Sequence, residues 1–343
     1  RATAAAVEAF AQMRRMPAYE RRELLQRIAE GLTADAAGIG ELLAREIGKP
    51  VRDARTEVLR TAAVFRIAGE EAERIGGEVM PLDLLATSRG RWGITRRMAI
   101  GPVAGISPFN VPLSLAGHKL GPALAAGNTI VHKPDSRVAL SSLRMARIMD
   151  AAGVPSGALS MLPMDREVGD GLVTDPRFRL LSFTGSARVG WDMRARAGTK
   201  KVALELGGNA ALIVDRSADI DRAVARTVAG AFKYAGQLCI SVQRVFVHRD
   251  HYDAFVAGLV SGAQALTVGD PLDENSDLGP MIDETAAERA VAWVDEAVEM
   301  GASVLTGGTR RGAYVDPIVV ADVPSRARLS CEEAFAPVVT VAP

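Results

Sequence analysis

The chain has 343 residues, of which 48% are hydrophobic and 24% are charged, the balance of a soluble globular protein with two domains. Its 41 basic and 41 acidic residues cancel, so no nucleic-acid or anionic membrane partner is expected. No apolar run approaches the ~20 residues that a membrane helix requires. Two cysteines are too few for a disulfide framework, and the N-terminus lacks a signal-peptide core, so a cytoplasmic location is expected.

The N-terminal region has a helical pattern. Residues 17–32 are predicted to form an amphipathic helix, because apolar side chains recur on one face opposite arginine and glutamate. Residues 48–50 supply a helix stop, and a second helix carries Val58 on its apolar face. Residues 84–100 contain a glycine turn and are predicted to form an extended excursion.

From residue 101 onward, short apolar strands alternate with helices. Strands are predicted at residues 103–106, 129–132, 158–162, 180–183 and 201–204. Helices are predicted between them, at residues 112–126, 139–152, 166–174 and 187–197. This alternation with short loops predicts an α/β fold with a parallel, doubly wound sheet that helices cover on both faces.

A second α/β unit is predicted to begin near Gly207. A strand is expected at residues 211–214 and a helix at residues 220–234, with Gly236 as the C-cap of the helix. Cys239 then lies on a loop just past a helix terminus, where reactive groups are often found.

Three polar side chains are candidates for carbonyl chemistry. The Cys239 thiol can attack a carbonyl carbon, although a lone cysteine is more often a buried apolar residue. Glu205 ends a predicted strand, where partial burial would raise its pKa and suit a base that activates water. Asn110, which could also be a simple turn residue between two prolines, offers an amide to a developing oxyanion.

Five segments, in their order along the chain, resemble the aldehyde dehydrogenase superfamily. They are residues 108–112, 183–186, 204–209, 234–240 and 332–337. The resemblance extends over nearly the whole chain and is closest to the branch of lactaldehyde and non-phosphorylating glyceraldehyde-phosphate dehydrogenases. Cys331 precedes the last segment and matches no nucleophile motif.

The resemblance implies a particular domain organisation. Residues 1–83 and 98–206 would form an NAD(P)-binding domain, residues 84–97 a hairpin that reaches a neighbouring subunit, and residues 207–343 a second α/β catalytic domain. Members of the family usually continue beyond the last segment, so the catalytic domain is expected to be incomplete at its C-terminus. A homodimer or homotetramer is expected for the full-length protein.

The resemblance also implies a mechanism. The Cys239 thiolate attacks the aldehyde, and the Asn110 amide with the backbone N–H of Cys239 holds the oxyanion. Hydride transfer to the nicotinamide leaves a thioester, and Glu205 activates water to release the acid. No metal is expected to take part.

The predicted cofactor is NAD or NADP, although the chain has no GxGxxG fingerprint. Instead, Gly185 forms a strand-to-helix turn, and Ser186 could cap a helix whose N–H groups favour pyrophosphate. By resemblance, Lys133 meets the adenosine ribose and Glu333 the nicotinamide ribose. The complete predicted set of cofactor contacts is Ile106, Ser107, Lys133, Ser136, Thr184, Gly185, Ser186, Leu206, Glu333 and Phe335.

Two positions depart from the pattern of the family. Ser136 stands where many NAD-dependent relatives have a glutamate that binds the ribose hydroxyls and repels a 2′-phosphate, so Lys133 could pair with the phosphate of NADP. The alternative is that Ser136 only caps a helix. Ala336 stands where the family usually has glycine, which leaves the fit of that loop open.

The substrate is expected to be a small hydroxy- or aliphatic aldehyde. Leu238 is apolar where relatives that act on a sugar phosphate have an arginine, which argues mildly against a phosphorylated aldehyde. One alternative is a CoA-acylating semialdehyde dehydrogenase, which Glu205 disfavours because that reaction needs no hydrolytic base. The other is an inactive structural or binding relative, which the presence of Asn110, Glu205 and Cys239 disfavours.

Overall fold

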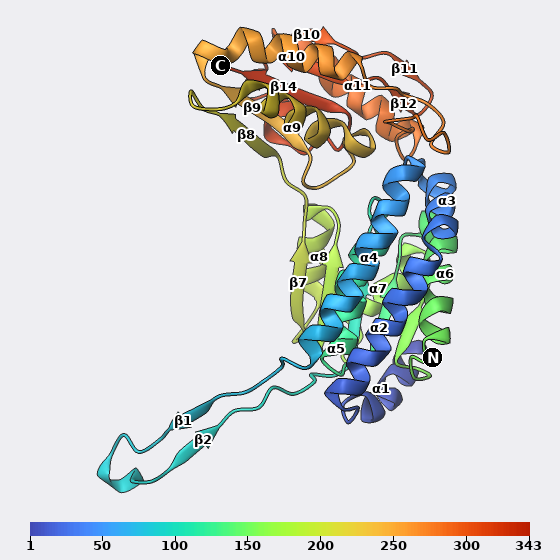
Figure 1. The fold of residues 1–343 in the computed structure, drawn as a ribbon, viewed down its shortest axis with the longest axis vertical. Coiled ribbons are helices and arrows are strands. Elements are labelled where there is room, and N and C mark those ends of the chain that lie inside the picture. Colours follow the sequence, from blue (N-terminus) through green and yellow to red (C-terminus); the bar gives the residue numbers. More distant parts are fainter. The chain divides into compact units, whose positions relative to one another are not determined.

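The computed structural model describes residues 1–343, which divide into two compact units (Figure 1). The first unit contains residues 1–36 and 57–205, and the second contains residues 37–56 and 206–343. The division after residue 205 lies next to the expected domain boundary at 206. Residues 37–56 belong to the second unit, which the sequence pattern did not indicate.

The first unit is built on a five-stranded parallel sheet in the order β5-β4-β3-β6-β7. Its strands are β3 (Val103–Ile106), β4 (Ile130–Lys133), β5 (Leu159–Met161), β6 (Leu180–Thr184) and β7 (Lys201–Glu205). The chain enters at the central strand, runs outward through β4 and β5, and returns to the other side for β6 and β7. The predicted doubly wound parallel sheet is therefore confirmed.

Seven helices accompany this sheet. They are α1 (Ala2–Met13), α2 (Ala18–Ala34), α4 (Val51–Ala72), α5 (Pro112–Ala125), α6 (Ala139–Ala151), α7 (Arg166–Thr174) and α8 (Ala187–Arg196). α5 follows β3 and contacts β3, β4, α2 and α6, and nearly all of its side chains are buried. α1 was not predicted from the sequence.

A two-stranded hairpin projects from the first unit (Figure 1). β1 (Val79–Pro81) pairs with β2 (Trp92–Ile94) in antiparallel register, so the excursion begins before the predicted residue 84. Leu84, Trp92 and Ile94 are at least three-quarters exposed.

The second unit has a mixed five-stranded sheet in the order β10-β13-β14-β9-β8, in which only β10 is antiparallel to its neighbour. Its strands are β8 (Ala210–Val214), β9 (Val242–Val247), β10 (Ser303–Thr306), β13 (Ile318–Ala321) and β14 (Val338–Ala342), with a small ribbon of β11 (Arg310–Arg311) and β12 (Tyr314–Val315). Its helices are α3 (Ala36–Ile47), α9 (Ile220–Phe232), α10 (Tyr252–Gln264), α11 (Glu284–Glu299) and α12 (Arg328–Cys331). No helix in the chain combines the length and the apolar character needed to span a bilayer.

The end of α9 differs from its prediction. The helix was expected to continue to residue 234, but it ends at Phe232, and a short 3-10 segment, η3 (Lys233–Gly236), follows. Tyr234 and Ala235 have φ angles of 50° and 52°, which lie outside the right-handed helical region. Gly236 has a positive φ as expected of a terminating glycine, but it closes this turn and not the helix itself.

Candidate functional site

In the first unit, the predicted site residues gather at the carboxyl ends of the parallel strands. β3 and β6 are hydrogen-bonded neighbours although β4 and β5 separate them in sequence, so the topological switch point lies between them. Ser107 follows β3 and Gly185 follows β6. Ligands of open α/β sheets bind at the carboxyl ends of the strands at such a point.

The turn from β6 into α8 requires its glycine. A Cβ on Gly185 would lie 2.6 Å from the Phe183 ring, and the Gly185 N–H donates to the Glu205 carbonyl at 3.0 Å. Thr184 pairs with Glu205 at the strand ends. Ser186 occupies the N-cap position of α8, but the predicted capping hydrogen bond from its side chain is absent. The first turn of α8 is exposed and keeps backbone N–H groups that can receive a phosphate.

Lys133 ends β4 with its side chain half-buried, and Ile106 is its cross-strand partner on β3. The stem of Lys133 passes Gly169 of α7, where a Cβ would come within 2.7 Å of the lysine Cδ. Burial lowers the pKa of Lys133, and attraction to Asp135 and Asp165 opposes this fall. The chain therefore holds a lysine ammonium at the strand end that was expected to meet a ribose.

Ser136 begins the 3-10 helix η2 (Ser136–Val138) and is exposed. The cap of this helix is Asp135, whose carboxylate accepts a hydrogen bond from the Arg137 N–H at 3.0 Å. The alternative that Ser136 caps the helix is therefore wrong. The Arg137 guanidinium pairs with Asp135 and stacks on the Phe109 ring at 4.5 Å, which adds a basic group beside position 136.

Glu205 ends β7 and is exposed, so the predicted half-burial of this carboxylate is wrong. β7 is the edge strand and has a neighbouring strand on one side only. A buried ammonium acts on this carboxylate. Lys119 of α5 donates to Thr184 Oγ1 at 2.8 Å and to Ser182 Oγ at 3.1 Å. Burial lowers the pKa of Lys119 to about 8, and attraction to Glu205 opposes this fall.

Sequence reasoning did not select Lys119. The available signal was a charged residue on the core face of an apolar helix, between Gly117 and Leu120. Lysine is almost never fully buried unless it is paired, and Lys119 is only 7% exposed. Such a position indicates a polar network inside the fold.

A second buried titratable group, His132 of β4, was also missed. It lies in one cross-strand row with Gly105 and Ser182, and its Nε2 is 3.0 Å from Ser107 Oγ. Burial, aided by the charge of Lys119, lowers the pKa of His132 to about 3, so the imidazole is neutral. Gly105 makes room for the ring, because a Cβ there would lie 2.8 Å from His132 Nδ1.

In the second unit, Cys239 is exposed in the turn between α9 and β9. Three successive left-handed residues shortly precede it, with φ angles of 50° at Tyr234, 52° at Ala235 and 67° at Gly236. A left-handed non-glycine residue costs about 1–3 kcal/mol and persists only where surrounding contacts impose it. One such contact is the hydrogen bond from the buried Tyr234 hydroxyl to the Ile47 carbonyl, at 3.0 Å.

The other cysteine has a different setting. Cys331 ends α12 and is exposed, and its thiol donates to the Ser325 carbonyl at 2.8 Å. Its backbone N–H bonds within the same turn, to Ala327. The surroundings of Cys331 are those of a short helix end.

Gln243 of β9 ties two of the predicted segments together. Its Nε2 donates to the Gly208 carbonyl at 2.7 Å, and its Oε1 accepts from the Ala334 N–H at 2.8 Å. The Gly208 N–H donates to Glu333 Oε1 at 3.3 Å, and burial raises the pKa of Glu333. A Cβ on Gly207 would collide with the Glu333 carboxylate, so a larger residue there would displace that side chain.

The segment after Glu333 packs against the turn before Cys239. A Cβ on Gly236 would collide with the Ala336 carbonyl, so these two backbones are in close approach. Phe335 is half-buried with a φ of 50°, whereas Ala336 is 2% exposed and needs no positive φ. Alanine therefore fits where glycine was expected. Leu206, at the start of this unit, is half-buried.

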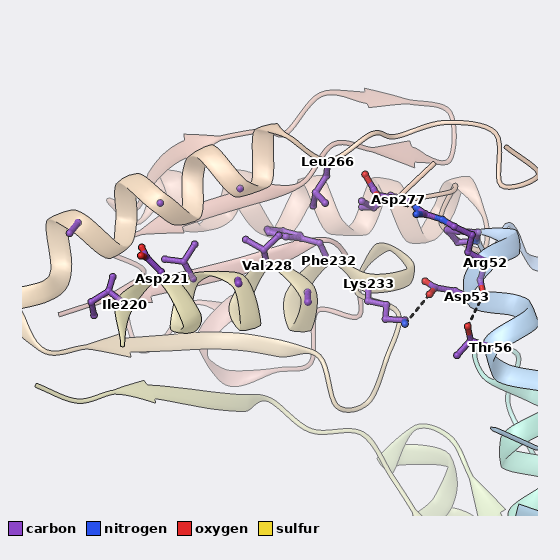
Figure 2. Close-up of a pocket in the computed structure, with 18 residues that line it drawn as sticks. Arg52, Asp53, Thr56, Ile220, Asp221, Val228, Phe232, Lys233, Leu266 and Asp277 are labelled. Carbon is purple, nitrogen blue, oxygen red and sulfur yellow. Dashed lines mark hydrogen bonds and ion pairs between the residues drawn. The ribbon is translucent and has the colours of Figure 1, made fainter. Parts of the chain in front are cut away.

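A hollow of about 760 Å³ in the second unit contains none of the predicted site residues. Figure 2 shows that it lies along α9 and α10, with apolar side chains such as Val228 and Leu266 facing it. At its polar end Lys233 pairs with Asp53 at 2.8 Å, and Arg52 pairs with Asp277 at 3.0 Å (Figure 2). These four charges are paired with one another.

The family model described as "Aldehyde dehydrogenase family" matches residues 1–343. The curated 3-sulfolactaldehyde dehydrogenase of Priestia megaterium is 44% identical over 325 residues, which are 94% of this chain and 68% of that protein. This chain thus spans about two thirds of the length of that relative.

Two solved structures are similar over nearly the whole chain. Aldehyde dehydrogenase 21 from Physcomitrella patens, in complex with the reaction product succinate, has a TM-score of 0.97 and 46% identity, over 99% of this chain and 71% of that chain. A glyceraldehyde-3-phosphate dehydrogenase from Methanocaldococcus jannaschii, complexed with NADP, has a TM-score of 0.95 and 37% identity, over 99% and 74%. These matches confirm the predicted fold and the predicted resemblance.

Proposed function

This chain belongs to the aldehyde dehydrogenase family, the oxidoreductases that convert aldehydes to acids with NAD or NADP, and we propose that it works through Cys239, Asn110 and Glu205. The observation that carries the proposal is the exposed thiol of Cys239 behind a backbone turn with two left-handed non-glycine residues. Strain of this kind clusters at active sites, where it fixes a reactive group.

The first stage forms a covalent bond. Cys239 Sγ, as the thiolate, attacks the aldehyde carbon, and the carbonyl electron pair moves to the oxygen. The Asn110 amide and the Cys239 N–H donate to that oxyanion, and Asn110 suits this role because it is buried and held between two prolines. The bound nicotinamide nucleotide supplies the hydride acceptor, after which the acyl group remains on Cys239 as a thioester.

The second stage releases the acid. Glu205 is exposed at a strand end, where it can take a proton from a water molecule that attacks the thioester. The ammonium of Lys119 attracts the Glu205 carboxylate. A base in contact with solvent supports hydrolysis over transfer to CoA.

The nucleotide is proposed to bind at the switch point of the parallel sheet. The exposed first turn of α8 would hold the pyrophosphate, and Lys133 with Ser136 would meet the adenosine ribose. Glu333 would accept from the ribose on the nicotinamide side. The glycine at 185 and the room that Gly169 leaves for the Lys133 stem support the first two contacts.

The substrate is proposed to be a short aldehyde with an anionic group. One relative is named for 3-sulfolactaldehyde, and one similar structure contains succinate as its product. These names extend the expected hydroxy- or aliphatic aldehyde to one that carries a sulfonate or a carboxylate.

An initial-rate comparison tests this function. We expect succinate semialdehyde or 3-sulfolactaldehyde to exceed butanal in kcat/KM by about tenfold or more, because one ion pair in a partly exposed site contributes ~1–2 kcal/mol. Rates are measured from nucleotide reduction in the full-length protein. Equal or better use of butanal would contradict the anionic substrate, and no reduction with any aldehyde would contradict the function itself.

Position 136 is proposed to set the choice of nucleotide. The wild-type protein should use NADP at least as well as NAD, and Ser136→Glu should shift the kcat/KM ratio towards NAD by about tenfold or more, because the added carboxylate repels a 2′-phosphate. Ser217→Glu, which adds the same charge at an exposed serine of the second unit, should leave the ratio unchanged. A ratio unaffected by Ser136→Glu would show that residue 136 does not face the ribose.

The β1–β2 hairpin is proposed to take part in a homodimer or homotetramer. Its support is the large exposure of Leu84, Trp92 and Ile94, since apolar patches of this kind mark protein interfaces. The cytoplasmic location remains a proposal that rests on the two cysteines.

A further inference from the structure

The helix that follows Asn110, α5, receives no side-chain cap from its own N-cap residue. α5 begins at Pro112, its N-cap residue is Val111, and no side chain of that residue bonds to the helix. Proline at the first helical position has no N–H, so the first N–H groups that need acceptors belong to Leu113 and Ser114. Both residues are buried, so water is not available to accept hydrogen bonds from their N–H groups.

The missing cap comes from another helix of the same unit. Glu57 of α4 is 4% exposed, and its Oε1 accepts hydrogen bonds from the Leu113 N–H at 2.9 Å and the Ser114 N–H at 3.3 Å. A carboxylate at a helix N-terminus also interacts favourably with the helix dipole. One buried side chain thus supplies both the acceptor and the charge.

Close packing of the two helices brings Glu57 to this position. A Cβ on Gly117 would lie 3.1 Å from Thr61 Cγ2, and one on Gly121 would lie 3.2 Å from Ala68 Cβ. The two glycines of α5 therefore let α4 run directly against it. The carboxylate reaches the start of α5 because no side chain holds the helices apart.

A short backbone segment of restricted conformation connects Asn110 to the capped start of α5. Only Val111 separates it from Pro112, whose ring fixes its own φ and restricts the residue before it. Pro108 fixes its own φ two residues before Asn110. A displacement of the start of α5 would therefore be transmitted to Asn110, which is itself 3% exposed.

We propose that Glu57 is a positioning residue for Asn110, and that its buried carboxylate fixes the oxyanion-binding amide by anchoring the start of α5. This inference rests on the role of Asn110 in the proposed function. Glu57 touches neither substrate nor nucleotide in this role. Its effect is expected in the formation of the thiohemiacetal, which the first turnover measures.

A double-mutant cycle tests the proposal in the full-length protein. Glu57→Ala should lower the first-turnover rate of nucleotide reduction by roughly tenfold or more, because small misplacements of catalytic groups cost up to about 100-fold. In the Asn110→Ala background the same change should cost less than about threefold, since an amide that is absent cannot be misplaced. KM for the nucleotide should change by less than about threefold in either background.

Three further variants keep the test decisive. Glu57→Gln retains an acceptor oxygen and should recover most of the first-turnover rate. Glu57→Asp moves the carboxylate back by one methylene and replaces Glu57→Ala if the alanine variant does not fold. Glu70→Gln removes an exposed carboxylate of the same helix, paired with Arg66, and should leave the rate unchanged. Equal losses in the two backgrounds would overturn the proposal. A negligible effect of Asn110→Ala alone would instead contradict the proposed function.

Discussion

Cys239→Ser is expected to abolish aldehyde oxidation, with a loss of roughly a thousandfold or more in kcat, because a serine hydroxyl ionises far less readily than a thiol and is a much weaker nucleophile at neutral pH. The substitution is nearly isosteric and lies in an exposed turn, so the fold should be retained. The measurement is the rate of nucleotide reduction, together with a thermal melt of both proteins.

Cys331→Ser is the matched control. Serine can donate to the Ser325 carbonyl as the thiol does, so this variant should keep most of the wild-type rate. A comparable loss in both variants would remove the distinction between the two cysteines. Retained oxidation in Cys239→Ser would exclude the covalent mechanism on that residue.

Glu205→Gln is expected to separate the two stages of the reaction. Hydride transfer needs the thiolate and the oxyanion donors, whereas hydrolysis needs a base, so the variant should keep a burst of about one reduced nucleotide per site. Steady-state turnover should fall by about 100-fold or more, because general base catalysis contributes ~10²–10⁴-fold. Stopped-flow measurement of the burst and the following slope gives both quantities.

The neighbouring lysine adds a pH signature to this experiment. Burial lowers the pKa of Lys119 to about 8, and attraction to Glu205 opposes this fall. Without that carboxylate, the ammonium of Lys119 should lose its proton at a lower pH.

Glu333→Gln serves as the comparison for Glu205→Gln. It should weaken nucleotide binding while leaving the ratio of burst to turnover unchanged. If burst and turnover fall together in Glu205→Gln, Glu205 acts before hydride transfer.

The strand–helix alternation of the first unit could be predicted from local signals. Apolar runs bounded by glycine and proline marked all five strands to within two residues, and α7 was predicted at residues 166–174, where it is observed. Such signals require only neighbours in sequence. The motif residues Asn110, Glu205 and Cys239 are likewise recognisable from the residues that flank them along the chain.

Features that depend on distant residues could not be predicted. Residues 37–56 belong to the second unit through tertiary contacts, such as the Val51 N–H to the Pro271 carbonyl at 2.8 Å. The helical pattern through Tyr234 is local, whereas its left-handed conformation is held by a hydrogen bond to Ile47. The exposure of Glu205 likewise reflects the place of β7 at the sheet edge, which depends on strand order.

The polar groups inside the first unit were missed for a similar reason. Lys119 and His132 acquire their properties from burial and from strand register, neither of which a sequence window contains. Gly105 is the clearest example. Its importance lies in the space it leaves for the His132 ring, which becomes evident only when the two strands are paired.

The neutral imidazole of His132 links folding to proton uptake. Its pKa is about 3 in the folded chain, against an ordinary value of 6.5. Well above pH 6.5 neither state binds this proton, so this residue does not make the free energy of unfolding depend on pH. As the pH falls below that value, the unfolded chain takes up a proton that the folded chain does not bind, so this residue reduces the free energy of unfolding by about 1.4 kcal/mol per pH unit down to about pH 3. The histidine that supports Ser107 therefore makes the first unit acid-labile.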